Sequence, residues 1–401
     1  MTEINSSSNK KEGLGAELVH LVKTNIRDYM MYMVLVAVII VFSILTHGKF
    51  ISAGNISNLF NQAAYVAVLA IGMTVILILK HIDLSVGYVA GFSGAVCALL
   101  LGKGWSVYLV IPTVILMGLL IGMYQGLLVT RLGVPAFVTT LAGMFIFRGL
   151  LGVATSKAGT IVVKDDTFNA LNNDFIPDVP VLGNMHFLTL LIGIIAVAAV
   201  IITQIKTRKN KQKYGFKVVA LPIFIAALIL ISAVIMVIIY VLAKEKGIPW
   251  SAVIVAVILF IYNFMLNKTK LGRYIYGIGG NDQAAELSGV NVKNVTLFAF
   301  CAMSVLATIA GILYTSRLKS ATPTAGNAFE MDAIASSYIG GVAVSGGVGK
   351  VTNTIIGTLV IMSLTNGMNL MGVDTFVQYI VKGAIFILAV AFDVITRKKA
   401  K

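Results

Sequence analysis

The sequence contains few charged side chains, and acidic ones are the scarcer kind. Charged residues make up 12% of the 401 positions, with 16 Asp and Glu against 31 Lys and Arg. Soluble domains carry roughly 25% charged residues, so this composition argues against a soluble protein. The formal net charge of +15 would fit nucleic-acid binding, but the basic residues fall between apolar runs and not along one face. We therefore expect no nucleic-acid partner.

Cysteine, histidine and catalytic motifs are also nearly absent. Cys97 and Cys301 lie far apart in apolar runs, the four histidines are scattered, and no HExxH or GxSxG motif occurs. The stretch SGGVGKV at 345–351 looks like a P-loop, but Val344 and Val351 stand where that motif needs Gly and Ser or Thr. We expect no catalytic residue, no metal and no cofactor, so the chain is not an enzyme and does not bind ATP itself.

Long apolar runs are what the sequence has in abundance, because 58% of its residues are hydrophobic. A bilayer core of about 30 Å requires roughly 20 helical residues. The candidate spans are 29–46, 62–79, 86–101, 107–129, 136–152, 187–205, 217–242, 249–266, 295–314, 331–345, 351–371 and 375–394. The runs 86–101 and 331–345 are short and Gly-rich, as half-helices would be. This predicts an all-α polytopic membrane protein with about 10–12 transmembrane helices.

The distribution of Lys and Arg predicts the orientation. With a cytoplasmic N-terminus, basic residues in the inner connections clearly outnumber those in the outer ones. The predicted parts are a cytoplasmic N-terminal segment (1–28), a transmembrane domain (29–396) and a cytoplasmic tail (397–401). No cleavable signal peptide is expected. Within the transmembrane domain, the basic loop 206–217 is expected inside, where it would touch anionic membrane lipid.

The outer loop 153–186 is long and carries four aspartates and no arginine. Loops longer than about 15 residues usually have a function or are disordered. We expect this loop to be a landing surface for an external partner, although a simple connector also fits.

A polar island at 267–294 interrupts the apolar pattern in the second half. Asn281 or Asp282 is a suitable helix N-cap and Gly289 a suitable C′ residue, which predicts a helix of about two turns between them. Ala284 and Ala285 would give this helix a face of small side chains. It is either a docking element for a cytoplasmic partner or an ordinary solvated loop helix.

Polar residues within or beside the spans are candidates for lining a transport pathway. The candidates are Asp83, Ser85, Arg148, Asn366, Asn369 and Gln378. Each has a structural alternative. Asp83 could cap the following helix, Arg148 could extend to the membrane interface, and the amides could bond between helices. Two Gly-interrupted stretches, 71–94 and 335–357, also resemble each other weakly, as paired pathway segments of transporters do.

Four stretches carry a resemblance to a known family. They read LKHIDLSVG (79–87), GVPAFVTTLAGMFIFRGL (133–150), GRYIYGIGGNDQAAELSGVNV (272–292) and AIASSYIGGVAVSGGVGKVTNTIIGTL (333–359). The chain resembles bacterial ABC sugar-importer permeases of the ribose/xylose/galactose type over most of 55–392. It is nearest the xylose or multiple-monosaccharide branch, because 206–266 reads as an insertion.

The resemblance implies an ABC importer permease fold, a bacterial plasma-membrane location and import of a monosaccharide such as xylose. It implies three protein partners: an ABC ATPase subunit, an extracytoplasmic sugar-binding protein and a second permease copy, most simply as a homodimer. The residues implied to contact the ATPase are Gly280, Asn281, Asp282, Ala284, Ala285, Glu286, Leu287, Ser288 and Gly289.

Two other classes of transporter remain open at this point. One is an ABC permease for nucleosides, branched-chain amino acids or another small neutral solute. The other is an ion-coupled secondary transporter, which the scarcity of acids in mid-span disfavours. The sequence does not specify which sugar is carried.

Overall fold

The chain folds into a bundle of helices with very little strand. The computed structural model describes residues 26–179, 181, 183, 185–216 and 218–399. In chain order, its α-helices are α2 (Ile26–Leu45), α3 (Ala53–Ile78), α4 (Val86–Gly102), α5 (Val107–Thr130), α6 (Ala136–Thr155), α7 (Asp166–Asn173), α8 (Phe187–Lys213), α9 (Leu221–Lys244), α10 (Trp250–Lys268), α11 (Lys270–Gly280), α12 (Asp282–Leu287), α13 (Val292–Leu318), α14 (Phe329–Ile339), α15 (Val351–Leu370) and α16 (Thr375–Lys399). A short 3-10 helix, η1 (Lys49–Ile51), precedes α3, and β1 (Ile161–Val162) pairs antiparallel with β2 (Ser320–Ala321).

Eight of the described helices are long and apolar enough to cross a membrane: α3, α5, α6, α8, α9, α10, α13 and α15. Shorter apolar stretches lie in α2, α4 and α16. The prediction of an all-α, polytopic membrane protein is therefore confirmed. The predicted span 331–345 is not a full crossing, because α14 has 11 residues. At 1.5 Å per residue it is about 16 Å long, which is half a bilayer core.

Helices α3 and α13 form the centre of the bundle. Eighteen of the 26 residues of α3 are buried, and α13 packs against α3, α4, α5 and α7. Glycines spaced by four residues allow the closest of these contacts: Gly118, Gly122 and Gly126 of α5 face α13, and a Cβ on any of them would strike it. Without a hydrophobic driving force between helices in lipid, such small residues let the backbones approach and pack.

Hydroxyl groups join the central helices across the apolar interior. Thr74 of α3 lies 2.7 Å from the Thr354 hydroxyl of α15 and donates to Ser337 of α14 at 3.3 Å. All three side chains are buried. In a membrane interior, such pairs satisfy polar groups that lipid cannot hydrate, so the position of α14 relative to α3 and α15 is fixed.

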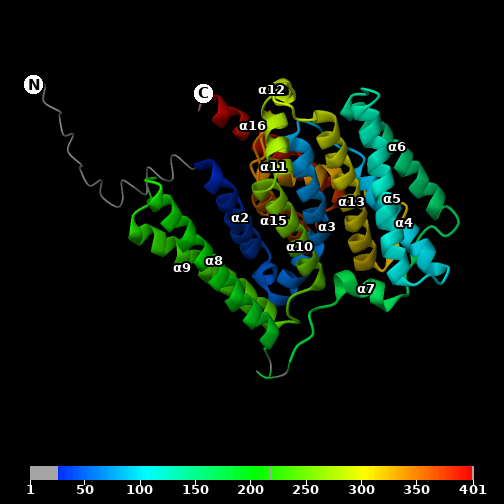
Figure 1. The fold of residues 1–401 in the computed structure, drawn as a ribbon. Helices are drawn as coiled ribbons and strands as arrows, with labels where there is room; N and C mark the ends of the chain where they lie inside the picture. Colours follow the sequence, from blue (N-terminus) through cyan, green and yellow to red (C-terminus); the bar gives the residue numbers. More distant parts are fainter. Residues whose placement is uncertain (1–25, 180, 182, 184, 217, 400–401) are drawn as a thin grey trace, which may run out of the picture.

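The antiparallel hairpin of α8 and α9 packs little against the rest of the chain. It stands apart from the bundle in Figure 1, and most of its side chains are exposed. The predicted basic loop 206–217 is mostly wrong as a loop, because α8 continues to Lys213 and carries these residues on its last turns. Arg208 lies over the Phe224 ring and donates to the Val219 carbonyl, which closes the hairpin.

The predicted terminal segments lie largely outside the described residues, which exclude 1–25, 400–401 and also Lys217 of the basic stretch.

The two ends of the bundle are distinct. Figure 1 shows α12 at one end and α7 at the other. We call these the α12 end and the α7 end. Helix α3 ends, and α13 begins, at the α12 end.

Candidate functional site

The short helix α12 has the capping predicted from the sequence. The Asn281 side chain accepts a hydrogen bond from the Ala284 backbone N–H at 2.9 Å, which makes it the N-cap. At the other end, Gly289 has a φ of +82°. The N–H of Val290 donates to the Ala285 carbonyl at 3.0 Å, as in a glycine-terminated helix. The chain thus holds two turns of helix in a fixed shape on the surface.

Exposure divides the residues of α12 into two faces. Leu287 is 90% exposed, more than any other large hydrophobic residue described. Ala285 is only 8% exposed and faces the bundle. The predicted face of small side chains is therefore divided, because Ala284 is exposed and Ala285 is not. The exposed members of the predicted set are Gly280, Asn281, Asp282, Ala284, Glu286, Leu287, Ser288 and Gly289.

A second helix in the polar island, α11, was missed by the sequence analysis. Its N-cap is Thr269, and its buried residues are Gly272, Ile275, Ile278 and Gly279. The signal was present as the spacing of these apolar residues by three and four. A Cβ on Gly279 would strike the Ile78 carbonyl and Gly347, so α11 packs directly on the end of α3 and on the glycine-rich loop 340–350. This contact fixes where α12 stands.

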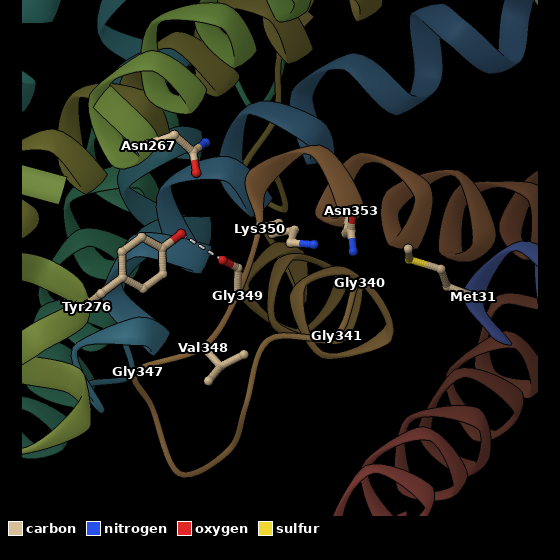
Figure 2. A pocket seen from close by; sticks show the side chains of 10 residues that line it. All are labelled: Met31, Asn267, Tyr276, Gly340, Gly341, Gly347, Val348, Gly349, Lys350 and Asn353. Atoms are coloured by element: carbon tan, nitrogen blue, oxygen red, sulfur yellow. Dashed lines mark hydrogen bonds between the residues drawn. The ribbon is translucent and has the colours of Figure 1, made fainter. Parts of the chain in front are cut away.

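A cavity of about 360 Å³ opens beside α11 at the α12 end. Figure 2 shows Lys350 and Asn353 between Tyr276 of α11 and Met31 of α2. The Tyr276 hydroxyl donates to the Gly349 carbonyl at 2.7 Å. Helix α11 is therefore joined to the loop that leads from α14 to α15, and a displacement of α12 would reach α14 through this loop.

Asp83 and Ser85 form a buried polar cluster at the start of α4. Asp83 Oδ1 accepts from the Ser85 N–H at 2.9 Å and from its hydroxyl at 2.7 Å. Gln125 of α5 donates to Ser85 Oγ at 2.8 Å. Both predicted residues are fully buried, so neither faces an open path in this conformation. Neither side chain caps an N–H of α4.

The three predicted amide residues also hold helices together. Asn366 of α15 accepts from Asn55 at 2.8 Å and donates to Gln62 at 3.3 Å, both on α3. Gln378 donates to Asn369 Oδ1 at 2.8 Å, across the turn between α15 and α16. These contacts match the structural alternative for each residue.

Arg148 differs from the other predicted pathway residues, because it contacts an aromatic ring. Its guanidinium lies over the Tyr88 ring, 5.7 Å from the centroid, and its side chain is exposed. The Tyr88 hydroxyl donates to Asn327 Oδ1 at 3.3 Å, and Asn327 donates to the Tyr379 hydroxyl at the same distance. Four helices or their ends, from α4, α6, α14 and α16, therefore meet in one polar cluster.

The sequence analysis missed Tyr88, Asn327 and Tyr379, as well as an ion pair between two helices. Lys382 of α16 donates to both carboxylate oxygens of Asp332 of α14, at 3.0 and 3.1 Å. The available signal was the shortness of the run at 331–345. A helix too short to cross the membrane begins inside it, so the polar residues around its start lie at depth.

The loop 153–186, which is predicted to lie outside, packs on the α7 end and presents exposed acids. Asp165 caps α7, while Asp166, Asp174 and Asp178 are exposed. Desolvation alone would raise the pKa of Asp178. Hydrogen bonds from the N–H groups of Leu188, Val179 and Phe187, and the nearby His186, outweigh it and hold the pKa below its usual value. This carboxylate stays charged and keeps the loop end on the start of α8.

Comparison with known proteins places the chain among membrane permeases. A family model described as "Branched-chain amino acid transport system / permease component" matches residues 55–390. The "Xylose transport system permease protein XylH" of Haemophilus influenzae is 36% identical over 94% of this chain and 99% of its own length. The Escherichia coli protein of the same name is also 36% identical, over 94% of both chains. The "Ribose import permease protein RbsC" of Haemophilus influenzae is 31% identical over 89% of this chain and 91% of its own length.

No solved structure matches the chain. The family match covers most of the sequence, the relatives align over nearly their whole length, and the helices are those of a multi-pass membrane protein. The chain belongs to the family of transport-system permease components and is a membrane transport subunit rather than an enzyme.

Proposed function

We propose that the chain is the membrane subunit of an ATP-driven, binding-protein-dependent importer of a monosaccharide, with D-xylose as the first candidate. The observation that carries this proposal is the alignment with a xylose permease over 94% of this chain and 99% of that protein. The ribose permeases that follow at about 30% identity support a pentose or hexose as the class of cargo.

The charges within the bundle support a neutral cargo. An amino acid would need fixed counter-charges for its carboxylate and ammonium groups. Lys382 is already bound to Asp332, and Arg148 rests on an aromatic ring. This arrangement favours a sugar over the branched-chain amino acids named in the family description.

In this proposal, α12 is where a separate ATPase subunit contacts the permease, and the α12 end faces the cytoplasm. The support is the exposure of Leu287 on a capped helix, since an exposed large apolar side chain at the tip of a rigid element is a typical anchor for a partner. Movement of the ATPase would shift α12, then α11, the glycine-rich loop and α14, because these elements are in contact.

The α7 end would then face outward and receive a sugar-binding protein, with Asp166, Asp174 and Asp178 available to its basic groups. Both chain termini would lie in the cytoplasm. A second copy of the chain is supported by Arg148 and Asn327, which are exposed on the isolated subunit. Such side chains avoid contact with lipid, so a path between two copies would provide their surroundings.

Reconstitution in sealed proteoliposomes tests the function. The chain is reconstituted with an ABC ATPase subunit that co-purifies with it and with a sugar-binding protein, and is supplied with radiolabelled D-xylose, D-ribose or L-leucine. We expect uptake of a monosaccharide only when ATP is on the α12 side and the binding protein is on the α7 side. Uptake driven by an ion gradient alone, or uptake of leucine but no sugar, would overturn the proposal.

A further inference from the structure

Helix α4 begins inside the bundle, where Ser85 and Val86 are buried. Its Ser93 hydroxyl lies 3.2 Å from that of Thr308 in α13, and Gly118, at the centre of α5, packs on the same threonine. Ala90 packs against Gly311. These contacts place the middle of α4 level with the centre of α5. The segment that leads into α4 lies nearer the α12 end, where Gln125 of α5 donates to Ser85.

Helix α14 begins beside the centre of α3. The ring of Phe329, its first residue, lies 4.7 Å from that of Tyr65, which is at the centre of α3. From there α14 runs to the α12 end, where Gly340 packs on Thr354 near the start of α15. Helix α4 runs the opposite way, to the α7 end, where it contacts β1 and β2. The two short helices thus run in opposite directions.

The two helix N-termini are in direct contact. A Cβ added to Gly87 would strike both the Gly326 carbonyl and the Glu330 carboxyl group. Glu330 is 6% exposed, and its Oε2 has no hydrogen-bond partner among the described residues. Helix N-termini carry partial positive charge, and discontinuous helices that meet at mid-membrane mark substrate sites in transporters. The Glu330 carboxyl group therefore lies buried between the two helix ends.

The Tyr88, Arg148, Asn327 and Tyr379 cluster lies at this meeting point. Tyr88 is the third residue of α4, and Asn327 comes two residues before α14. Tyr379 is 42% exposed, and both Asn327 and Arg148 are exposed. A charged group and an amide are costly against hydrocarbon, which favours surroundings that contain water.

We propose that these four residues form the permease's own sugar-contact site. The proposal rests on the function proposed above and adds the place where the sugar is held. An amide offers both donor and acceptor to neighbouring hydroxyls, the tyrosines add an apolar ring face and a hydroxyl each, and the guanidinium donates further hydrogen bonds. These groups suit an uncharged molecule rich in hydroxyls.

Variants of the exposed members test the site in the reconstituted transporter. We expect Asn327→Ala and Tyr379→Phe each to lower ATP-driven sugar uptake at least fivefold, with the double variant lower still. ATP hydrolysis stimulated by the loaded binding protein should stay within twofold of the unmodified protein, because α12 is untouched. The matched control is Tyr240→Phe on α9, whose tyrosine is 45% exposed, and it should change neither rate.

A chemical measurement makes the test independent of activity. In a background with Cys97 and Cys301 replaced by alanine, Asn327→Cys should react with a small, charged, water-soluble thiol reagent. Millimolar transported sugar should slow this reaction at least threefold. A cysteine that does not react, or that reacts at the same rate with and without sugar, would overturn the site.

The outcomes separate this site from the proposed function. If the unmodified transporter imports no monosaccharide, the function fails first. If it imports a sugar and both variants match Tyr240→Phe in uptake, the function stands and the site is wrong.

Discussion

Asp332 and Lys382 place two opposite charges inside the helix bundle, where isolated charges are costly. Their side chains are 13% and 18% exposed, and two hydrogen bonds join them. The Lys382 side chain also lies one turn after Tyr379 on the same face of α16. The pair therefore fixes α16 against α14 beside the proposed contact site.

Replacing either member of this pair tests how much the ion pair stabilises the folded protein. Asp332→Asn or Lys382→Met alone leaves one buried charge without its partner, which typically costs about 3–5 kcal/mol. We expect each single variant to unfold at clearly lower temperature in detergent, and the double variant to recover much of the loss. Independent, additive losses in this double-mutant cycle would show that the two groups do not interact.

Gly87 offers a second test at the scale of one side chain. The Gly87→Ala variant would place a methyl group against the Gly326 carbonyl and the Glu330 carboxyl. Such overpacking lowers the free energy of unfolding by about 1–3 kcal/mol. The matched control is Gly149→Ala on α6, where a Cβ meets nothing within 4 Å. Thermal unfolding should fall for the first variant and stay level or rise for the second. Equal unfolding temperatures would contradict the close contact between the two helix starts.

At this scale the sequence predicted local features well. Asn281 and Gly289 follow from capping rules that involve only neighbouring residues, and the structure has both. It did not predict which of Ala284 and Ala285 faces outward, because that depends on how α11 packs. The contacts around Arg148 could not be predicted either, since Tyr88 and Asn327 lie in distant parts of the sequence.

At the scale of elements, α12 is a small helix with one prominent apolar tip. Helix α11 holds it, and the glycine-rich loop holds α11. The ATPase contact proposed for α12 therefore depends most on the residue that protrudes farthest from this support, which is Leu287.

We expect Leu287→Ala to lower ATP-driven uptake about tenfold, which corresponds to 1.4 kcal/mol of lost contact energy. The protein should still insert and unfold normally, because this side chain is 90% exposed and little of it packs on its own subunit. Leu230→Ala on α9 is the control, since that leucine is also exposed, at 66%. Uptake and ATPase co-purification are measured together. Unchanged values for Leu287→Ala would remove α12 from the docking surface.

Most elements were predictable from apolar runs, because a bilayer fixes the length of a crossing helix. The exceptions are α11, which is amphipathic and lies in a polar stretch, and the basic end of α8, which stays helical beyond its apolar run. The weak internal similarity between 71–94 and 335–357 stays a prediction. The structural counterpart of the start of α4 is instead the start of α14.

For the whole molecule, the proposed topology places the α12 end and the α7 end on opposite sides of the membrane. Cysteine labelling from one side tests this placement. In a background without Cys97 and Cys301, Gln283→Cys and Lys164→Cys place single thiols on exposed positions at the two ends. A membrane-impermeant reagent should label Lys164→Cys in intact cells and Gln283→Cys only after the membrane is opened. Labelling of both from outside would contradict the orientation.

The overall class was predictable because composition alone indicates a membrane protein, and four motifs indicate the family. The arrangement of the polar cluster was not, because it arises from contacts between residues separated by more than 200 positions, such as Tyr88 and Asn327. Apolar periodicity gives no information about which polar residues converge.

The opposed starts of α4 and α14 have a mechanical consequence. Each of these helices is shorter than α3 and α13 and is preceded by a non-helical segment within the protein, while α3 and α13 are long enough to cross a membrane. The permease could thus open toward either side by tilting α4 and α14 while α3 and α13 stay in place. Such motion would leave the lipid boundary unchanged, so its energetic cost would fall on internal packing and not on the surrounding bilayer.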